Sequence, residues 1–172
     1  TGLPSMLACE LFEHHCSSPY PREVLEELLT YIGFHTLTIE LLAKTLEINR
    51  SINLSKALDL IRNKSLASDE LQMGINVMHN MYGEEVDLYP YLLAIFNISD
   101  LSLPEQKLLS IFSLLPVEPI LGEKLAKLLL IEKENLGRFW KDLNLLFRKG
   151  WLIKEQDRFV CHALIQEVMR HK

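Results

Sequence analysis

Four residues near the start of the sequence, Cys9, His14, His15 and Cys16, are of types that could bind a metal ion. Thiolates and imidazoles are the ligands that structural zinc prefers, but zinc sites usually take short loop-borne pairs such as CxxC. These residues lie on a predicted helix, where adjacent histidines point roughly 100° apart and more distant members share one face poorly. The sequence therefore predicts a half-buried helix end here, and no metal site.

His162 stands where a predicted strand runs into a predicted helix. Such a junction directs free backbone N–H groups and the positive end of a helix dipole outward, which suits a phosphate group. The imidazole could donate a hydrogen bond to the same anion. A boundary histidine that is hydrogen-bonded within the fold is the simpler interpretation, and these residues alone leave both open.

The motifs of self-contained enzymes are missing from the sequence. There is no GxxxxGK[ST] loop to hold phosphates, no GxGxxG after a strand and no HExxH. There is also no CxxC and no GxSxG, and no nucleophile, base and acid at a spacing that suggests a catalytic set. We therefore expect no catalytic residue in this chain.

The composition is that of a globular chain with a sizeable core, 48% hydrophobic and 24% charged. The formal net charge of −5 argues against non-specific binding to nucleic acid, which needs positive charge. Three cysteines are an odd and sparse set, which indicates a reducing cytoplasm. No apolar run reaches the ~18 residues of a membrane span, so no membrane contact is expected. The chain opens in mid-pattern without Met, which suggests a piece of a longer protein.

Almost every long apolar pattern in the sequence has the period of a helix. Helices are predicted over residues 5–16, 21–33, 36–48, 53–63, 102–116, 121–131, 132–150 and 163–172, and either a helix or an extended pair over 88–99. Gly33 and Gly150 are expected just past helix ends, and Pro21 at a first helical position. Ser102 and Glu105 fit a capping box at the start of their helix.

The period changes at residues 151–162, "WLIKEQDRFVCH", which read as two short strands joined by a polar turn. Three helices, a hairpin and a further helix are the element order of a winged helix. Residues 64–87 have only a weak pattern and are predicted as a loop, with a domain boundary near or just after them. The predicted fold is mainly α: a helical bundle subdomain (1–90), then a winged-helix domain (91–172) with a small β-hairpin.

A winged helix raises the question of DNA binding, for which the helix over residues 132–150 would be the reader. A reader helix needs polar and basic side chains on its outer face. The charges of this segment are mixed in sign: Glu132, Lys133, Glu134, Arg138, Lys141, Asp142, Arg148 and Lys149. This balance argues against a nucleic-acid partner, and a winged-helix DNA-binding transcription regulator with a helical partner-binding domain is kept as the alternative function.

Several stretches, in order, resemble the NB-ARC or STAND-type signal-transduction ATPases. "GFHTLTIEL" (33–41) is similar to their GxxPLAxxL turn, and "FVCHALIQEV" (159–168) to the end of their winged helix, with its Met-His-Asp triplet. "ELFEHH" (10–15) looks like the helix that ends their nucleotide-binding domain. "LSLPEQKLLSIFSLLP" (101–116) and "LNLLFRKGWLIKE" (143–155) look like winged-helix segments. The resemblance covers nearly the whole chain.

The resemblance implies a cytoplasmic, regulated switch. A P-loop nucleotide domain would come first, followed by the helical subdomain and the winged helix, which close over ADP at rest. Exchange for ATP would open the clamp and permit assembly into a homo-oligomer, with a downstream sensor or repeat domain as a further partner. This chain lacks the P-loop and the Mg²⁺-binding acid, so the resemblance implies ADP or ATP in the full-length protein and no cofactor on this fragment alone.

Carried over to this sequence, the resemblance places Thr36 and Leu37 beside adenine and ribose, and His162 at the β-phosphate. Thr36 stands where the family has proline, so it lacks the flat ring and fixed φ of proline and offers a methyl group. The triplet reads Cys161-His162-Ala163, so the histidine is kept and the acid that follows it is absent.

Overall fold

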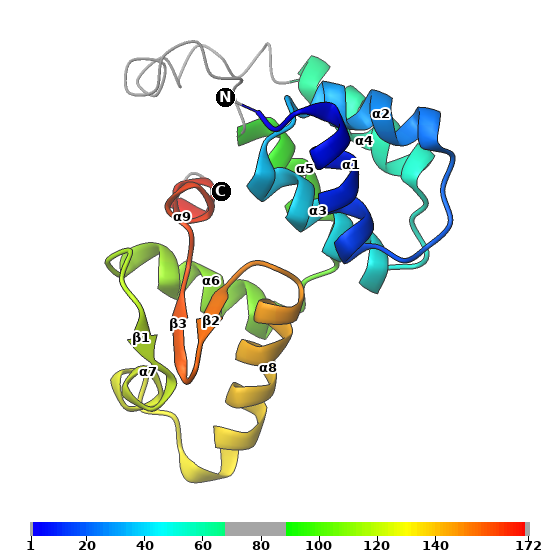
Figure 1. Cartoon of the computed structure of the whole chain (residues 1–172). Helices are drawn as coiled ribbons and strands as arrows, with labels where there is room; N and C mark the ends of the chain where they lie inside the picture. The colour runs from blue at the N-terminus through cyan, green and yellow to red at the C-terminus, as the bar shows by residue number, and fades with distance from the viewer. Residues whose placement is uncertain (1, 68–88, 171–172) are drawn as a thin grey trace. The chain divides into compact units, whose positions relative to one another are not determined.

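The computed structural model in Figure 1 describes residues 2–67 and 89–170. It is mainly helical with one small antiparallel sheet, which confirms the predicted fold class. The chain divides into two compact units, Thr1–Asp100 and Leu101–Lys172. Helix α5 (Tyr89–Ile98) packs on helices of the first unit and belongs to it, so the division falls after the weakly patterned region and after this helix. Most of the loop predicted over 64–87 lies outside the described residues.

The described part of the first unit is a bundle of helices: α1 (Ser5–His15), α2 (Arg22–Tyr31), α3 (Thr36–Ile48), α4 (Leu54–Ala67) and α5. Helix α3 packs against both α1 and α5, and its side chains Ile39 and Leu42 are fully buried. Phe12 of α1 is also buried and meets the ring of Tyr20 edge-on, with 5.3 Å between ring centres. Residues 88–99, for which the sequence left a helix or an extended pair open, contain helix α5.

Helix α2 ends in the manner predicted from Gly33. Gly33 has a φ of 65°, a conformation that costs glycine little because it has no Cβ. The Gly33 N–H donates to the Thr30 carbonyl and the Phe34 N–H to the Leu29 carbonyl. These two bonds form a Schellman motif, which satisfies carbonyls that the end of a helix leaves free.

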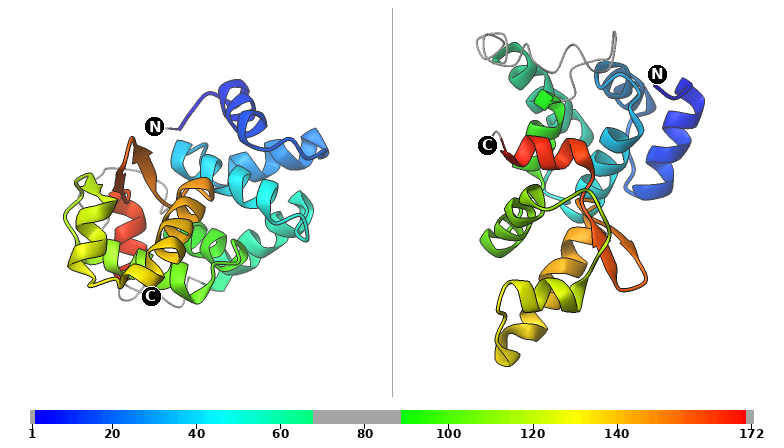
Figure 2. Two further views of the ribbon diagram at one scale, coloured as in Figure 1. Left: turned by 90° about the horizontal axis from the view of Figure 1, so that it is seen from below. Right: turned by 90° about the vertical axis from the view of Figure 1, so that its left-hand side faces the viewer.

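The second unit has the winged-helix order of elements. They are α6 (Leu103–Leu114), β1 (Ile120–Leu121), α7 (Gly122–Leu128), the 3₁₀ turn η2 (Lys133–Asn135), α8 (Leu136–Arg148), β2 (Ile153–Glu155), β3 (Arg158–Val160) and α9 (Ala163–Arg170). The sheet order is β1-β3-β2 with both pairs antiparallel, and Phe159 lies opposite Ile120 on one side and Lys154 on the other. Figure 2 shows the β2–β3 hairpin beside α8.

The start of α6 is joined to the end of α8 by a buried ion pair. Ser102 and Glu105 form the predicted capping box, in which the Ser102 N–H donates to Glu105 Oε2 at 2.7 Å. The Glu105 side chain is only 2% exposed, and Lys149 Nζ lies 2.8 Å from Oε1 and 3.0 Å from Oε2. A buried carboxylate is tolerated only when it is paired, so Lys149 is required by the capping box that Glu105 completes.

No glycine cap follows α6. Side chains of α9 donate hydrogen bonds to the carbonyls at its end instead. Gln166 Nε2 donates to the carbonyls of Phe112 and Leu115 at 2.9 and 3.2 Å. Arg170 Nε donates to the Ser113 carbonyl at 2.8 Å. The Phe112 carbonyl also accepts the Leu115 N–H at 3.2 Å, so Gln166 supplies a second donor there, at the end of a helix where intrahelical partners run out. The two helices are therefore joined by polar contacts as well as by the buried Phe112 and Ile165.

Leu130 ends α7 with an unfavourable backbone conformation. It occupies the position that usually takes glycine in a Schellman motif, with a φ of 53° and a side chain that is 85% exposed. A residue with a Cβ pays roughly 1 kcal/mol for this conformation, and its exposed side chain offsets little of that cost. Leu130→Gly should therefore raise the free energy of unfolding by about 0.5 to 1 kcal/mol, measured in urea; a decrease would show that Leu130 makes a stabilising contact.

Candidate functional site

His162 is the cap of helix α9. It lies between strand β3 and the helix, and its half-buried imidazole accepts a hydrogen bond at Nδ1 from the Leu164 N–H at 3.2 Å. The His162 carbonyl accepts the Gln166 N–H at 3.0 Å, which is the first bond of the helix. An N-cap side chain satisfies one of the free N–H groups in this way, although asparagine, aspartate and serine are the usual choices. His162 thus caps the helix itself, and Ala163, which stands where the family has an acid, has no side chain that could do so.

This hydrogen bond also sets the protonation of the ring. Burial lowers the pKa of His162 below the ordinary value for histidine, so the neutral form is favoured at pH 7. Because Nδ1 accepts a hydrogen bond, the single proton of the neutral ring is on Nε2. The residue therefore offers a neutral N–H donor at Nε2 rather than a positive charge. The sequence left open a boundary histidine that is hydrogen-bonded within the fold, but which ring nitrogen accepts the bond depends on the ring orientation.

Thr36 and Leu37 come together at the start of helix α3. Thr36 is exposed and Leu37 is half-buried, and His35 before them is in an extended conformation. On the preceding side, the Leu3 N–H donates to the Phe34 carbonyl at 2.9 Å, so the first residues of the chain border this turn. Thr36 and Leu37 belong to the first unit and His162 to the second.

Thr36→Pro should leave the fold of the first unit intact. Thr36 is the first residue of α3, where proline has no helical N–H bond to break. His35 already has a φ of −78° and a ψ of 123°, the extended conformation that a following proline requires. We expect a change between 0 and about +1 kcal/mol in the free energy of unfolding, because proline restricts the unfolded chain. A loss of more than about 1 kcal/mol would mean that the Thr36 N–H has a partner that the helix needs.

The cysteines and histidines of α1 do not form a metal-binding group. Cys9 and Cys16 are buried, and burial raises the pKa of both thiols. His14 and His15 stack edge to face with 4.9 Å between ring centres. Within residues 2–67 and 89–170, no three His, Cys, Asp or Glu side chains gather as a metal ion would need.

Two hollows in the first unit do not coincide with the predicted site residues. One, of about 420 Å³, is lined by Tyr20 and Arg50 among others, and the second, of about 410 Å³, by Lys56 and Asn97 among others. Neither is lined by Thr36 or Leu37. The candidate adenine contact therefore lies outside these two hollows, at the start of helix α3.

The described part of the chain has no helix that is both long and apolar enough to cross a lipid bilayer. Comparison of the sequence with protein-family models and with curated proteins gives no match, and no solved structure matches the fold.

Proposed function

We propose that this chain is the regulatory part of a cytoplasmic STAND-type switch. In the full-length protein it would close over ADP held by a P-loop domain and transmit the nucleotide state to a downstream sensor or repeat domain and to a homo-oligomer. The observation that carries the proposal is the geometry of His162, which caps α9 through Nδ1 and keeps Nε2–H as a donor. The order of helical bundle and winged helix supports it.

A neutral donor at this position suits a phosphate contact that must be both made and released. A hydrogen bond to a charged group contributes about 1.5 to 3 kcal/mol. That corresponds to about a 10- to 150-fold change in affinity, enough to distinguish a closed state from an open one. A fully charged imidazolium would lose the Leu164 N–H bond, since its Nδ1 would then carry a proton. The cap and the phosphate contact are therefore compatible only in the neutral ring.

The adenine side of the proposal rests on Thr36 and Leu37. In this scheme the exposed Thr36 presents its methyl group to the base and Leu37 supports it from the half-buried side of α3. Both lie in the first turn of α3, shortly after the Schellman motif that ends α2. This arrangement predicts a weaker apolar contact than a proline ring would give.

The test is the rate of ADP release from the full-length protein, with two substitutions of His162. His162→Asn keeps an acceptor for the Leu164 N–H and so preserves the cap, but removes the Nε2–H donor. His162→Ala removes both and should also cost about 1 kcal/mol of stability. We expect ADP to leave both variants at least tenfold faster, with an unchanged melting temperature for His162→Asn.

An unchanged ADP release rate in His162→Asn would rule out the phosphate role. The proposal also requires a GxxxxGK[ST] motif in the polypeptide upstream of Thr1. A natural start close to Thr1 would overturn the whole assignment.

A further inference from the structure

The charged side chains of helix α8 differ in their exposure to solvent. The side chains of Arg138, Lys141 and Arg148 are exposed, and spacings of three and seven residues place them on one face of the helix. Asp142, the only acid within α8, is half-buried. Burial and the nearby Glu105 raise its pKa, whereas the nearby cations Arg138 and Lys141 lower it. The two other acids of the predicted reader segment precede the helix. The fully exposed charges of α8 are therefore three cations, and its one acid is half-buried beside two of them.

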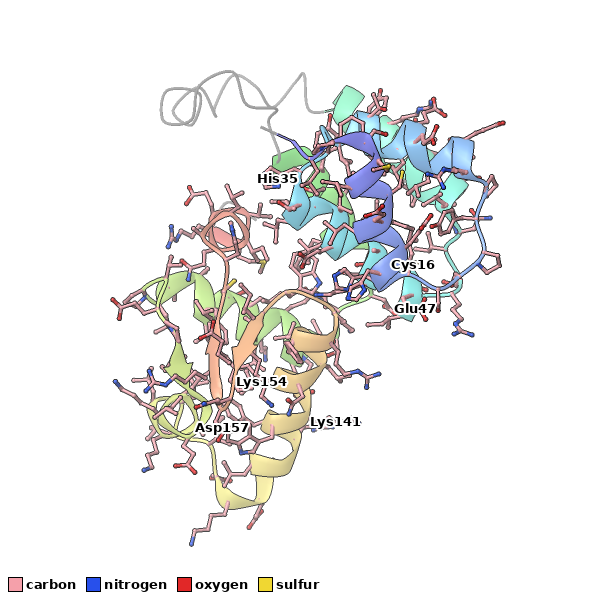
Figure 3. All side chains as sticks on the ribbon, in the orientation of Figure 1. Cys16, His35, Glu47, Lys141, Lys154 and Asp157 are labelled. Atoms are coloured by element: carbon pink, nitrogen blue, oxygen red, sulfur yellow. The ribbon has the colours of Figure 1, made fainter. Side chains whose placement is uncertain are left out.

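The neighbouring hairpin carries charges of both signs, Lys154 and Arg158 with the exposed acids Glu155 and Asp157. Lys154 of the neighbouring strand, labelled in Figure 3, donates to Asn144 Oδ1 at 3.0 Å. Its ammonium lies 5.4 Å from the centre of the Phe159 ring. Asn144 in turn donates to the Trp140 carbonyl at 2.8 Å. Gly137, in the first turn of α8, borders open space: a Cβ there would meet no atom within 4 Å.

The acidity of the chain belongs to the first unit. Residues 101–172 contain 12 Lys and Arg against nine Asp and Glu, whereas residues 1–100 contain six against 14. The formal charge is therefore +3 for the second unit and −8 for the first. The overall charge of −5 is thus a poor guide to the surface around α8.

We propose that the outer face of α8 binds the phosphate backbone of double-stranded DNA through Arg138, Lys141 and Arg148. The equivalent helix of helix-turn-helix proteins docks in the major groove, so both the fold and the charge suit this occupant. Asparagine is one of the side chains that read adenine. The amide of Asn144, however, is already hydrogen-bonded to the Trp140 carbonyl and to Lys154, so it is not available to a base. The binding is therefore largely independent of base sequence, and it does not depend on the nucleotide switch.

The charges set the expected salt dependence. Each phosphate neutralised contributes about −0.9 to the slope of log affinity against log salt, so three contacts give about −2.7. Between about 50 and 200 mM salt this slope weakens binding about 40-fold. The acidic first unit repels DNA at long range, so we expect micromolar binding only at the low-salt end.

The test is fluorescence anisotropy of short labelled DNA duplexes of two unrelated sequences, titrated with the whole chain at several salt concentrations. The triple variant Arg138→Gln, Lys141→Gln, Arg148→Gln should lose at least tenfold in affinity and most of the salt slope. Lys141→Gln alone should reduce the slope by about 0.9. The matched control is Lys107→Gln with Lys124→Gln, two exposed lysines of α6 and α7, which should change affinity less than twofold.

Three outcomes would overturn the proposal. One is the absence of binding at about 50 mM salt, and another is equal affinity for the wild type and the triple variant. The third is a protein that does not bind DNA but whose mass in analytical ultracentrifugation, without DNA, differs between the wild type and the triple variant. That result would assign the α8 face to an acidic surface of a second copy. Circular dichroism should show matching melting temperatures, since exposed charges contribute little to stability.

Discussion

Replacing Lys149 with methionine should lower the free energy of unfolding of the second unit by about 3 kcal/mol or more at neutral pH. The substitution leaves the Glu105 carboxylate buried without its ammonium partner, at a position that is only 2% exposed. Removing one member of a buried ion pair is far more costly than losing the net contribution of the pair. Urea unfolding followed by tryptophan fluorescence would measure this, because both tryptophans, Trp140 and Trp151, lie in the second unit.

The size of this effect should depend on pH through Glu105. Burial alone raises the pKa of the Glu105 carboxyl, but hydrogen bonds from Lys149 and Ser102 outweigh it and hold the pKa below its ordinary value. A lowered pKa contributes stability above the unfolded-state value of about 4.3, and this stability is lost as the pH falls through the folded-state value. The wild type should therefore lose stability in acid faster than Lys149→Met, and their unfolding curves should converge.

Two further variants test the assignment to the ion pair. Glu105→Gln combined with Lys149→Met leaves a neutral amide that still completes the capping box, so it should recover much of the loss. Lys107→Met removes an exposed lysine from the same helix as Glu105 and should change stability by less than about 0.5 kcal/mol. An equal loss for Lys149→Met at neutral pH and near pH 3 would contradict the electrostatic explanation.

Gly122→Ala should destabilise the second unit by about 2 kcal/mol. A Cβ on Gly122 would lie 2.3 and 2.4 Å from Cη2 and Cζ3 of Trp140, and 3.3 Å from the Phe159 ring. The indole ring is rigid and packs against Phe159, with 6.3 Å between ring centres, so it cannot move away freely. Thermal unfolding followed by circular dichroism avoids the change in indole fluorescence that the substitution itself causes.

Gly137→Ala is the matched control, because the same added methyl group meets open space there. It should stabilise the protein by about 0.5 to 1 kcal/mol, since alanine favours the helix more than glycine does. Replacing the indole ring in the double variant Gly122→Ala, Trp140→Leu should remove most of the clash. Its loss in the free energy of unfolding should therefore be smaller than the sum of the two single losses. Simple additivity would show that Gly122 is needed for a reason other than space.

Local sequence signals predicted much of this fold. The capping box at Ser102 and Glu105 and the glycines at helix ends, Gly33 and Gly150, act within a few residues. The hairpin was also predicted, because the apolar period changes there. Where a signal acts within one turn, the sequence is enough.

The remainder depended on contacts between distant segments. Strand β1 has only two residues and exists because it pairs with β3, so no periodicity could reveal it. The sequence instead predicted a helix over 121–131, which in the structure begins one residue later and ends at Leu128, before the left-handed Leu130. The charge order of the segment suggested a reader of mixed charge, whereas the fully exposed charges of α8 itself are all cations. The cap at His162 could be found only from the ring orientation.

The polar join between α6 and α9 has a consequence for synthesis of the protein on the ribosome. The last carbonyls of α6 receive their hydrogen bonds from Gln166 and Arg170, more than 50 positions later in the chain. Until α9 has left the ribosome, the end of α6 therefore lacks these side-chain donors and keeps only the local bond from the Leu115 N–H to the Phe112 carbonyl. The last contacts of this unit therefore form at the end of α6, which is synthesised early, and they come from Gln166 and Arg170, which are synthesised late.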